Sequence, residues 1–181
     1  KDDLVKSLIL TGEGNTFCAG ADLEYLQQIF NNSTLENYDD SKSLAELFLK
    51  VYEFSKPTIA AVNGAAIAGG CGLASVCDFI IAHPEKSKFG YSEVKIGFIP
   101  AIVSIFLIKK VGEGLARQLF LEGEIISGKK AYEIGFANYI SENVLDESLN
   151  LAERLNRNSV ESLRLTKQMI NDLSNLTVRE A

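Results

Sequence analysis

The chain has 181 residues, of which 46% are hydrophobic and 23% are charged, and its formal net charge is −6. The length and composition are ordinary for one soluble globular domain, and the negative charge argues against a nucleic-acid partner, because phosphate binding needs a clustered basic face. With one histidine, His83, and three cysteines that lack zinc-type spacing, the sequence excludes most metal sites and the Ser-His-Asp mechanism.

Apolar residues are distributed in short runs. None approaches the roughly 20 residues that a membrane-spanning helix needs, and the longest, 102–108, predicts a buried helix. No signal peptide precedes the first strand. We therefore expect a cytoplasmic protein with no membrane partner. Two of the three cysteines lie in apolar surroundings and are expected to be small core residues.

The first third of the chain begins with a strand pattern. Residues 5–11 are β-branched and leucine-rich and run into the loop 12–15, which predicts a strand followed by a turn. A turn of small residues covers 17–22, and a helix is expected over about 23–30. The Asn/Ser/Asp-rich segment 31–41 predicts a mobile surface loop.

Helical spacing then alternates with short apolar runs. Leu44, Leu47, Phe48, Val51 and Phe54 predict a helix that Lys56-Pro57 ends, and strands are expected over 58–62, 78–82 and 88–90. A small-residue stretch, 65–72, leads into a helical segment that reaches Val76. From Ala101 onward the pattern is mostly helical, with predicted faces at Leu145, Leu149, Ala152 and Leu155, and at Leu165, Met169, Leu173 and Leu176. Strands interleaved with helices predict an α/β fold.

The first glycine-rich turn invites comparison with dinucleotide-binding sites. Gly12 and Gly14 follow a strand, but Phe17 stands where the fingerprint needs its third glycine. The chain also lacks the Gly-Lys-Ser/Thr of a phosphate-binding P-loop. Neither nucleotide site is therefore expected.

The second glycine-rich turn, 64–72, is more informative. Glycines at the start of a helix expose N–H groups without an intrahelical acceptor, which suits a developing negative charge on oxygen. Tight packing of the helix against a strand explains the same residues. The turn 19–22 offers a second set of amides beside small side chains. Two such donors that converge on one carbonyl oxygen would form an oxyanion hole for a thioester.

A series of motifs resembles the enoyl-CoA hydratase/isomerase (crotonase) superfamily over nearly the whole chain. The motifs are Phe17-Cys18-Ala19-Gly20-Ala21-Asp22-Leu23, Lys56-Pro57-Thr58-Ile59-Ala60-Ala61-Val62-Asn63-Gly64, Ala68-Gly69-Gly70-Cys71-Gly72-Leu73-Ala74, Cys77-Asp78, Phe89-Gly90-Tyr91-Ser92-Glu93 and Gly97-Phe98-Ile99-Pro100. The resemblance implies a core of repeated ββα units (1–140) with a helical C-terminal region (141–181). It also implies an acyl-CoA thioester substrate, assembly as homotrimers or hexamers, and a chain truncated at both ends.

The resemblance also implies roles for individual residues. The two oxyanion amides fall on Ala21 and Gly69, and the catalytic acid falls on Glu93. The further residues predicted to bind substrate are Ala19, Asp22, Leu23, Glu24, Gly70 and Tyr91. No metal or separate cofactor is expected, because coenzyme A is part of the substrate.

One departure from the family pattern shapes the predicted reaction. Typical hydratases carry two glutamates, and the position of the first is occupied here by Gly72. Members that move a double bond between the 3- and 2-positions commonly keep only the acid that matches Glu93. The sequence therefore favours isomerisation over hydration. A divergent hydratase, an acyl-CoA decarboxylase and a non-catalytic acyl-CoA-binding subunit remain alternatives.

Four other polar residues have simpler interpretations. Asp22 is expected to cap the helix that follows it, and Asp78 to satisfy backbone donors at a strand start. His83 precedes a proline at a strand end and is expected to face solvent. Tyr91 shapes the acyl pocket or packs in the core, and the sequence does not separate the two.

Overall fold

The computed structural model describes residues 4–173, apart from the side chains of Leu23 and Leu26. The strands are β1 (Leu8–Thr11), β2 (Thr16–Cys18), β3 (Thr58–Val62), β4 (Ala65–Ile67), β5 (Phe79–Ala82), β6 (Lys88–Gly90), β7 (Ile126–Ser127) and β8 (Tyr139–Ile140). The helices are α1 (Leu23–Ile29), α2 (Thr34–Tyr52), α3 (Gly69–Ser75), the 3₁₀ helix η1 (Glu93–Ile96), α4 (Ala101–Glu122), α5 (Gly128–Glu133), α6 (Val144–Asn156) and α7 (Val160–Leu173).

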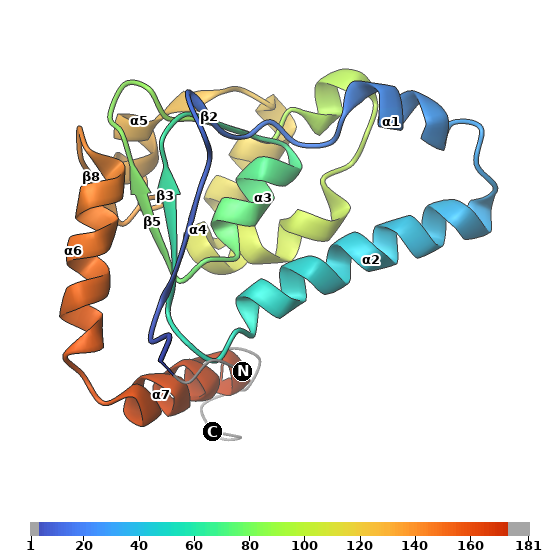
Figure 1. Ribbon diagram of the computed structural model, residues 1–181. Coiled ribbons are helices and arrows are strands. Elements are labelled where there is room, and N and C mark those ends of the chain that lie inside the picture. The colour runs from blue at the N-terminus through green and yellow to red at the C-terminus, as the bar shows by residue number, and fades with distance from the viewer. Residues whose placement is uncertain (1–3, 174–181) are drawn as a thin grey trace.

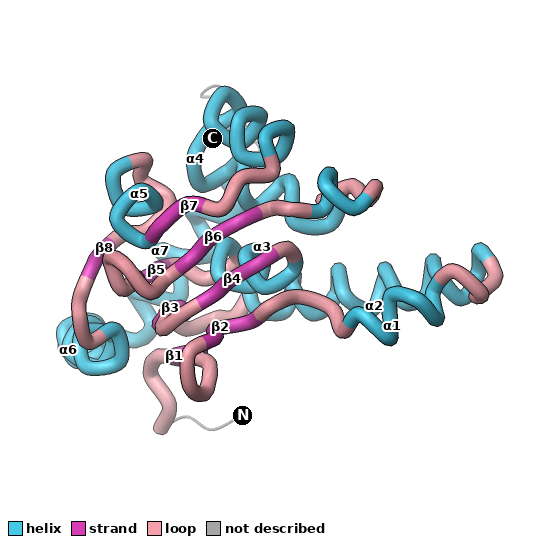
Figure 2. Tube along the Cα trace, turned by 90° about the horizontal axis from the view of Figure 1, so that it is seen from above, coloured by secondary structure: helices cyan, strands magenta, loops and turns pink. Residues whose placement is uncertain are grey.

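The strands form two sheets (Figures 1 and 2). Sheet A has the order β1-β3-β5-β8, and sheet B has the order β2-β4-β6-β7. Within the described chain every pairing is parallel except that of β6 with β7. From β1 to β6 consecutive strands alternate between the sheets, and each pair of strands is followed by a helix, as in β3-β4-α3 and β5-β6-η1-α4. The predicted α/β class with a ββα core is confirmed.

Both faces of sheet A are buried. Ala60 and Val62 of β3 point into the main core with α3 and α4, whereas Ile59 and Ala61 point into a second cluster with Leu151 of α6. Figure 1 shows α6 on one side of this sheet and α3 and α4 on the other. Burial on both faces explains why β3 is an unbroken apolar run instead of an alternating one.

The prediction of a mobile loop over 31–41 is wrong, because α2 begins at Thr34 and includes the rest of this segment. Ser33 and Glu36 form a reciprocal capping box: the Glu36 N–H donates to Ser33 Oγ over 3.3 Å, and the Ser33 N–H donates to a Glu36 carboxylate oxygen over 2.8 Å. This local start signal outweighs the polar composition of the segment. Helices α1 and α2 extend away from the sheets (Figure 1).

The region after Ala101 is mostly helical, as predicted. Strand pairing adds the short strands β4, β7 and β8, which the sequence did not indicate. The small residues of β4 form a strand because they pair with both β2 and β6. The region after Ala101 contains β7 and β8 besides its helices, since β6 and β5 provide edges for them.

The prediction that Leu145, Leu149, Ala152 and Leu155 mark the apolar face of α6 is wrong in part. Leu145 and Leu149 are 44% and 49% exposed, whereas Ser148 is fully buried. Its hydroxyl donates to the Val144 carbonyl over 2.7 Å, so a polar side chain occupies a core position at little cost.

The expected apolar face of α7 is largely exposed. Leu165 and Met169 are 49% and 51% exposed, and Leu176 lies outside the described residues. No helix of the described chain is long and apolar enough to cross a membrane.

Candidate active site

The predicted site segments follow three neighbouring parallel strands of sheet B. Residues 19–22 follow β2, Ala68 and Gly69 follow β4, and residues 91–93 follow β6. Parallel strands place their carboxyl ends at the same edge, which is where open α/β sheets commonly bind ligands. Figure 2 shows these strands side by side. The sheet thus brings together segments that lie up to 74 residues apart in the sequence (19 to 93).

The two glycine-rich turns are in close contact. A Cβ atom placed on Gly20 would lie 3.1 Å from the Ile67 carbonyl oxygen and 3.7 Å from the Gly69 nitrogen. A Cβ atom on Gly70 would lie only 1.9 Å from the Cys18 carbonyl oxygen. The turn after β2 therefore packs directly on the start of α3, and glycine is required at position 70 because any side chain would collide with backbone.

The two predicted oxyanion amides are available as donors. Within the described part of the chain, neither the Ala21 N–H nor the Gly69 N–H has a hydrogen-bond acceptor. Gly69 is the first residue of α3, so its N–H has no intrahelical partner. A Cβ atom on Gly69 would meet nothing within 4 Å, so the space beside it is open. The convergence of both amides on one ligand oxygen remains a prediction.

The backbone turns sharply at Ala68, immediately before Gly69. Its φ of 51° and ψ of −122° belong to a region that glycine prefers, and among the described residues Ala68 alone has a positive φ without being glycine. Its N–H donates to the Gly90 carbonyl over 2.8 Å, which anchors the turn to β6. Strain of this kind concentrates at functional sites. No signal in the sequence pointed to Ala68.

Glu93 begins η1 at the same edge of sheet B. Its carbonyl oxygen accepts the Phe98 N–H over 3.0 Å, which closes the turn through Gly97. The side chain is half-buried, and its Oε2 atom is buried without a hydrogen-bond partner in the described chain. Burial raises the pKa of the Glu93 carboxyl above its ordinary value of 4.5. A desolvated carboxyl with an unsatisfied oxygen is typical of an acid/base catalyst.

Position 72 has no room for a side chain. A Cβ atom on Gly72 would lie 2.1 Å from Cγ1 of Val103 and 2.9 Å from its Cβ. Val103 belongs to α4 and is 4% exposed, so it cannot move aside without repacking the core. The absence of a carboxylate at position 72 can be read from the sequence, whereas the valine that fills its place cannot.

The segment after the first turn lies on the surface. Asp22 caps α1 by accepting the Glu24 N–H over 2.7 Å, so the predicted capping role is confirmed. Ala19, Asp22 and Glu24 are exposed, and the side chain of Leu23 lies outside the described part of the structure. Contacts of these residues with a substrate remain predictions.

Tyr91 is buried inside the core. Its side chain is 2% exposed, and its ring packs edge-on against Phe120 with 4.9 Å between centroids. Its hydroxyl lies beside Cys71 and Ser75, and burial raises the pKa of Tyr91 well above its ordinary value. This position favours the packing role over a contact with substrate.

His83 does not face solvent, contrary to expectation. It is 6% exposed, and its Nδ1 atom accepts the N–H groups of Glu85 and Lys86 over 3.1 Å each. Its Nε2 atom lies 3.0 Å from a carboxylate oxygen of Glu142. The imidazole therefore stabilises the turn between β5 and β6, which explains why a residue before proline is buried.

Asp78 has the predicted structural role. Its Oδ2 atom accepts the Thr58 N–H over 2.8 Å and the Thr58 hydroxyl over 3.0 Å. Lys167 of α7 donates to the same oxygen over 2.7 Å, so Asp78 joins α7 to the start of β3. Cys71 and Cys77 are buried as expected of core residues, and burial raises the pKa of each thiol to about 12.

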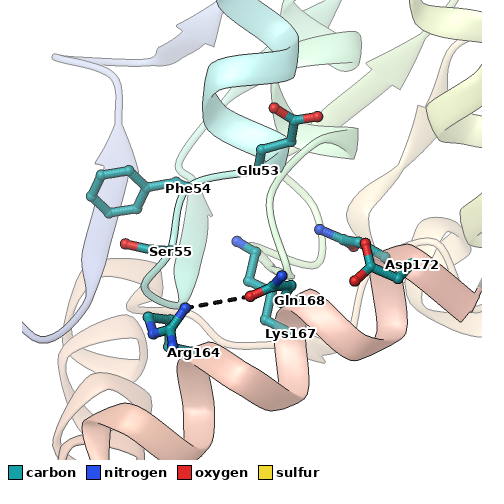
Figure 3. Close-up of a pocket in the computed structure, with 8 residues that line it drawn as sticks. Glu53, Phe54, Ser55, Arg164, Lys167, Gln168 and Asp172 are labelled. Atoms are coloured by element: carbon teal, nitrogen blue, oxygen red, sulfur yellow. Dashed lines mark hydrogen bonds between the residues drawn. The ribbon is translucent and has the colours of Figure 1, made fainter.

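One cavity lies away from the predicted site residues. It has a volume of about 250 Å³ between α7 and the turn after α2, and is lined by Glu53, Phe54, Ser55, Arg164, Lys167, Gln168, Asn171 and Asp172 (Figure 3). Arg164 donates to Gln168 over 3.3 Å and pairs with Glu161 at 2.6 Å. The two cations of this cavity already have anionic partners, so it does not resemble an anion site. In the described chain no three His, Cys, Asp or Glu side chains are grouped as metal ligands.

Comparison with known proteins identifies relatives of this arrangement. The model of the enoyl-CoA hydratase/isomerase family matches residues 1–181. A Thermus thermophilus protein assigned as an enoyl-CoA hydratase is 44% identical over 171 residues, which cover 93% of this chain and 67% of the relative. The crotonyl-CoA hydratase of Syntrophomonas wolfei is 36% identical, with 94% and 66% covered. The chain thus spans about two thirds of the length of these relatives.

Solved structures show the same fold. An enoyl-CoA hydratase from Shewanella pealeana superimposes with a TM-score of 0.94 at 30% identity, covering 99% of this chain and 68% of that one. The described ββα architecture is therefore the crotonase fold.

Proposed function

This chain belongs to the enoyl-CoA hydratase/isomerase family, and on that premise we propose that it acts on acyl-CoA thioesters by stabilising an enolate and moving protons with Glu93 alone. One observation carries the proposal. The half-buried carboxyl of Glu93 has an oxygen without a hydrogen-bond partner and lies at the same edge of sheet B as two contacting turns, whose Ala21 and Gly69 amides have no acceptor among the described residues. Position 72, where a second carboxylate would be expected, is a glycine.

The proposed reaction begins when the thioester oxygen accepts hydrogen bonds from the Ala21 and Gly69 N–H groups. The Glu93 carboxylate removes a proton from C2 of a 3-enoyl thioester, and the electron pair of the C–H bond moves to the oxygen as the enolate. The proton then passes from Glu93 to C4, and the double bond ends between C2 and C3. Proton transfer by a positioned group contributes about 10²–10⁴-fold, and each oxyanion donor about 10²–10³-fold.

Hydration of a 2-enoyl thioester is the second candidate. The named activities of the relatives favour it, because they are hydratases. The absence of a side chain at position 72 favours isomerisation, because water activation in this family commonly uses a second glutamate there. Decarboxylation and acyl-CoA binding without turnover are further alternatives that the same assay separates.

The proposed chemistry needs no metal or redox cofactor, because protons move and the electrons shift within the substrate. The family relationship supports assembly into homotrimers or hexamers. Both statements belong to the proposal.

A thioester panel tests the proposal. Straight-chain 3-enoyl-CoA, 2-enoyl-CoA and a carboxyacyl-CoA are supplied separately, and the products are separated by chromatography and identified by mass spectrometry. Glu93→Gln should lose at least about 10²-fold in turnover and keep its melting temperature, whereas Glu46→Gln, an exposed acid on α2, should behave as wild type. Turnover by Glu93→Gln near the wild-type rate would exclude Glu93 as the acid/base.

A further inference from the structure

Position 72 lies on the same face of α3 as the predicted oxyanion residue. Gly69 and Gly72 are three residues apart in one helix, so Cβ atoms at the two positions point in similar directions. Their surroundings differ completely. A Cβ atom on Gly69 would meet nothing within 4 Å, whereas one on Gly72 would overlap Val103. On this face of α3 the space is therefore open beside Gly69 and filled by Val103 beside Gly72, one helical turn further on.

Val103 is part of an apolar wall. A Cβ atom on Gly72 would lie 3.5 Å from Cζ of Phe48, and Phe48 packs edge-on against Phe106 with 6.4 Å between ring centroids. Val103, Phe48 and Phe106 are 4%, 2% and 6% exposed. They come from α4 and α2, so two helices fix the position of this wall. None of the three side chains can hold a water molecule by a hydrogen bond.

The apolar wall affects whether the proposed enolate site favours hydration or isomerisation. Hydration needs a water oxygen to form a bond with C3 while one water proton leaves to a base and C2 takes a proton. Isomerisation needs only the carboxyl of Glu93, which takes a proton from C2 and returns it to C4. A water beside apolar side chains lacks partners, and burying an unpaired polar group is unfavourable.

We propose that Val103 is a specificity-determining residue: it fills the place in which a second carboxylate would stand and keeps water from the α3 side of the acyl group. The inference rests on the proposed thioester chemistry at Glu93 and Gly69. Val103 favours return of the proton to carbon over addition of water.

The experiment measures the ratio of hydrated to isomerised product from straight-chain 3-enoyl-CoA and 2-enoyl-CoA. Val103→Thr keeps the shape of the side chain and adds a hydroxyl, and Val103→Ala opens space. Both should raise the ratio at least tenfold. Val103→Ile, the matched control, keeps the wall apolar and should leave the ratio unchanged or lower it.

Introducing a carboxylate at position 72 is a second test of the proposed role of Val103. Gly72→Glu alone should lose stability, because its Cβ atom collides with Val103. Gly72→Glu combined with Val103→Ala should fold better than Gly72→Glu alone and raise the ratio above that of Val103→Ala.

The outcomes separate this inference from the proposed function. An unchanged ratio in Val103→Thr and Val103→Ala, with melting temperatures showing folded protein, overturns the role of Val103 and leaves the Glu93 chemistry standing. Formation of only hydrated product by the wild-type enzyme also overturns the proposed role of Val103. If Glu93→Gln retains full turnover, the proposed function fails independently of any result at position 103.

Discussion

Two edges of the sheets differ in how their polar groups are satisfied. At the carboxyl end of sheet B, the Gly69 N–H and the Glu93 Oε2 atom have no partner within the described chain, and Ala68 holds a strained turn. At the amino end of sheet A, Asp78 accepts three hydrogen bonds, from Thr58 and from Lys167. The cavity lined by Lys167 lies at this second edge.

The predicted site and the cavity therefore lie at different edges, and the two edges differ in whether their polar groups are paired. Buried polar groups in folded proteins are usually paired, and an unpaired one costs stability. Charges around Asp78 stabilise the fold because they are paired. At the end of sheet B the buried Oε2 atom of Glu93 costs stability in the free protein, which is expected where a ligand supplies the missing partner.

The largest expected effect is the loss of one oxyanion donor. Gly69→Pro removes the N–H; proline is accepted at the first position of a helix, but its ring disfavours the φ of 51° and ψ of −122° of the preceding Ala68, so activity is compared per folded molecule. Turnover of the enoyl-CoA substrate should fall by about 10²–10³-fold. Gly69→Ala keeps the N–H and is the matched control: its methyl group enters open space, so it should fold normally and retain more activity than Gly69→Pro. Equal activity of the two variants would remove Gly69 from the oxyanion hole.

Breaking the Asp78 network should produce the opposite pattern. Asp78→Asn weakens the contacts with Thr58 and leaves Lys167, 12% exposed, without its carboxylate. The free energy of unfolding should fall by about 1–2 kcal/mol, a value reduced for partial exposure. Turnover per folded molecule should not change. Chemical denaturation measures the free energy of unfolding, and an activity assay on the same sample measures turnover. A loss of turnover without a loss of stability would contradict a purely structural role of Asp78.

The pH dependence sharpens the description of Glu93. Burial raises the pKa of its carboxyl, and the proposed reaction begins from the carboxylate. The acid limb of kcat/KM should therefore lie above the ordinary glutamate value of 4.5. Because the folded state holds this proton more tightly than the unfolded state, the Glu93 contribution to stability should increase as the pH falls through the same range. Glu93→Gln should abolish that contribution, and an acid limb at or below 4.5 would oppose the assignment.

Relief of the strained turn should give the smallest effect. Ala68→Gly places glycine at a φ of 51°, which favours the folded state, but it also adds entropy to the unfolded chain. The net gain in stability should be at most about 1 kcal/mol. Activity should decrease slightly, because the turn that positions Gly69 becomes freer. A lower melting temperature would show that the entropy added to the unfolded chain outweighs the strain relieved at position 68.

The sequence by itself determined the features that depend on local pattern. It predicted β3 and β6 with their observed bounds, the Asp22 cap and the series of family motifs. The start of α2, residues 34–41, was not predicted, because the polar composition of this segment favours a loop. The Ser33/Glu36 capping box, which favours a helix, is also present in the sequence.

Other features were decided only by the tertiary structure. The contact of Gly20 with Gly69 depends on β2 and β4 pairing in parallel, and β4 itself is recognisable only between its neighbours. The missing carboxylate illustrates the same division. Gly72 could be read from the sequence, but its replacement in space is Val103, 31 positions further along, because α3 and α4 pack their faces together. Periodicity along one chain carries no record of which side chain fills the space beside a glycine.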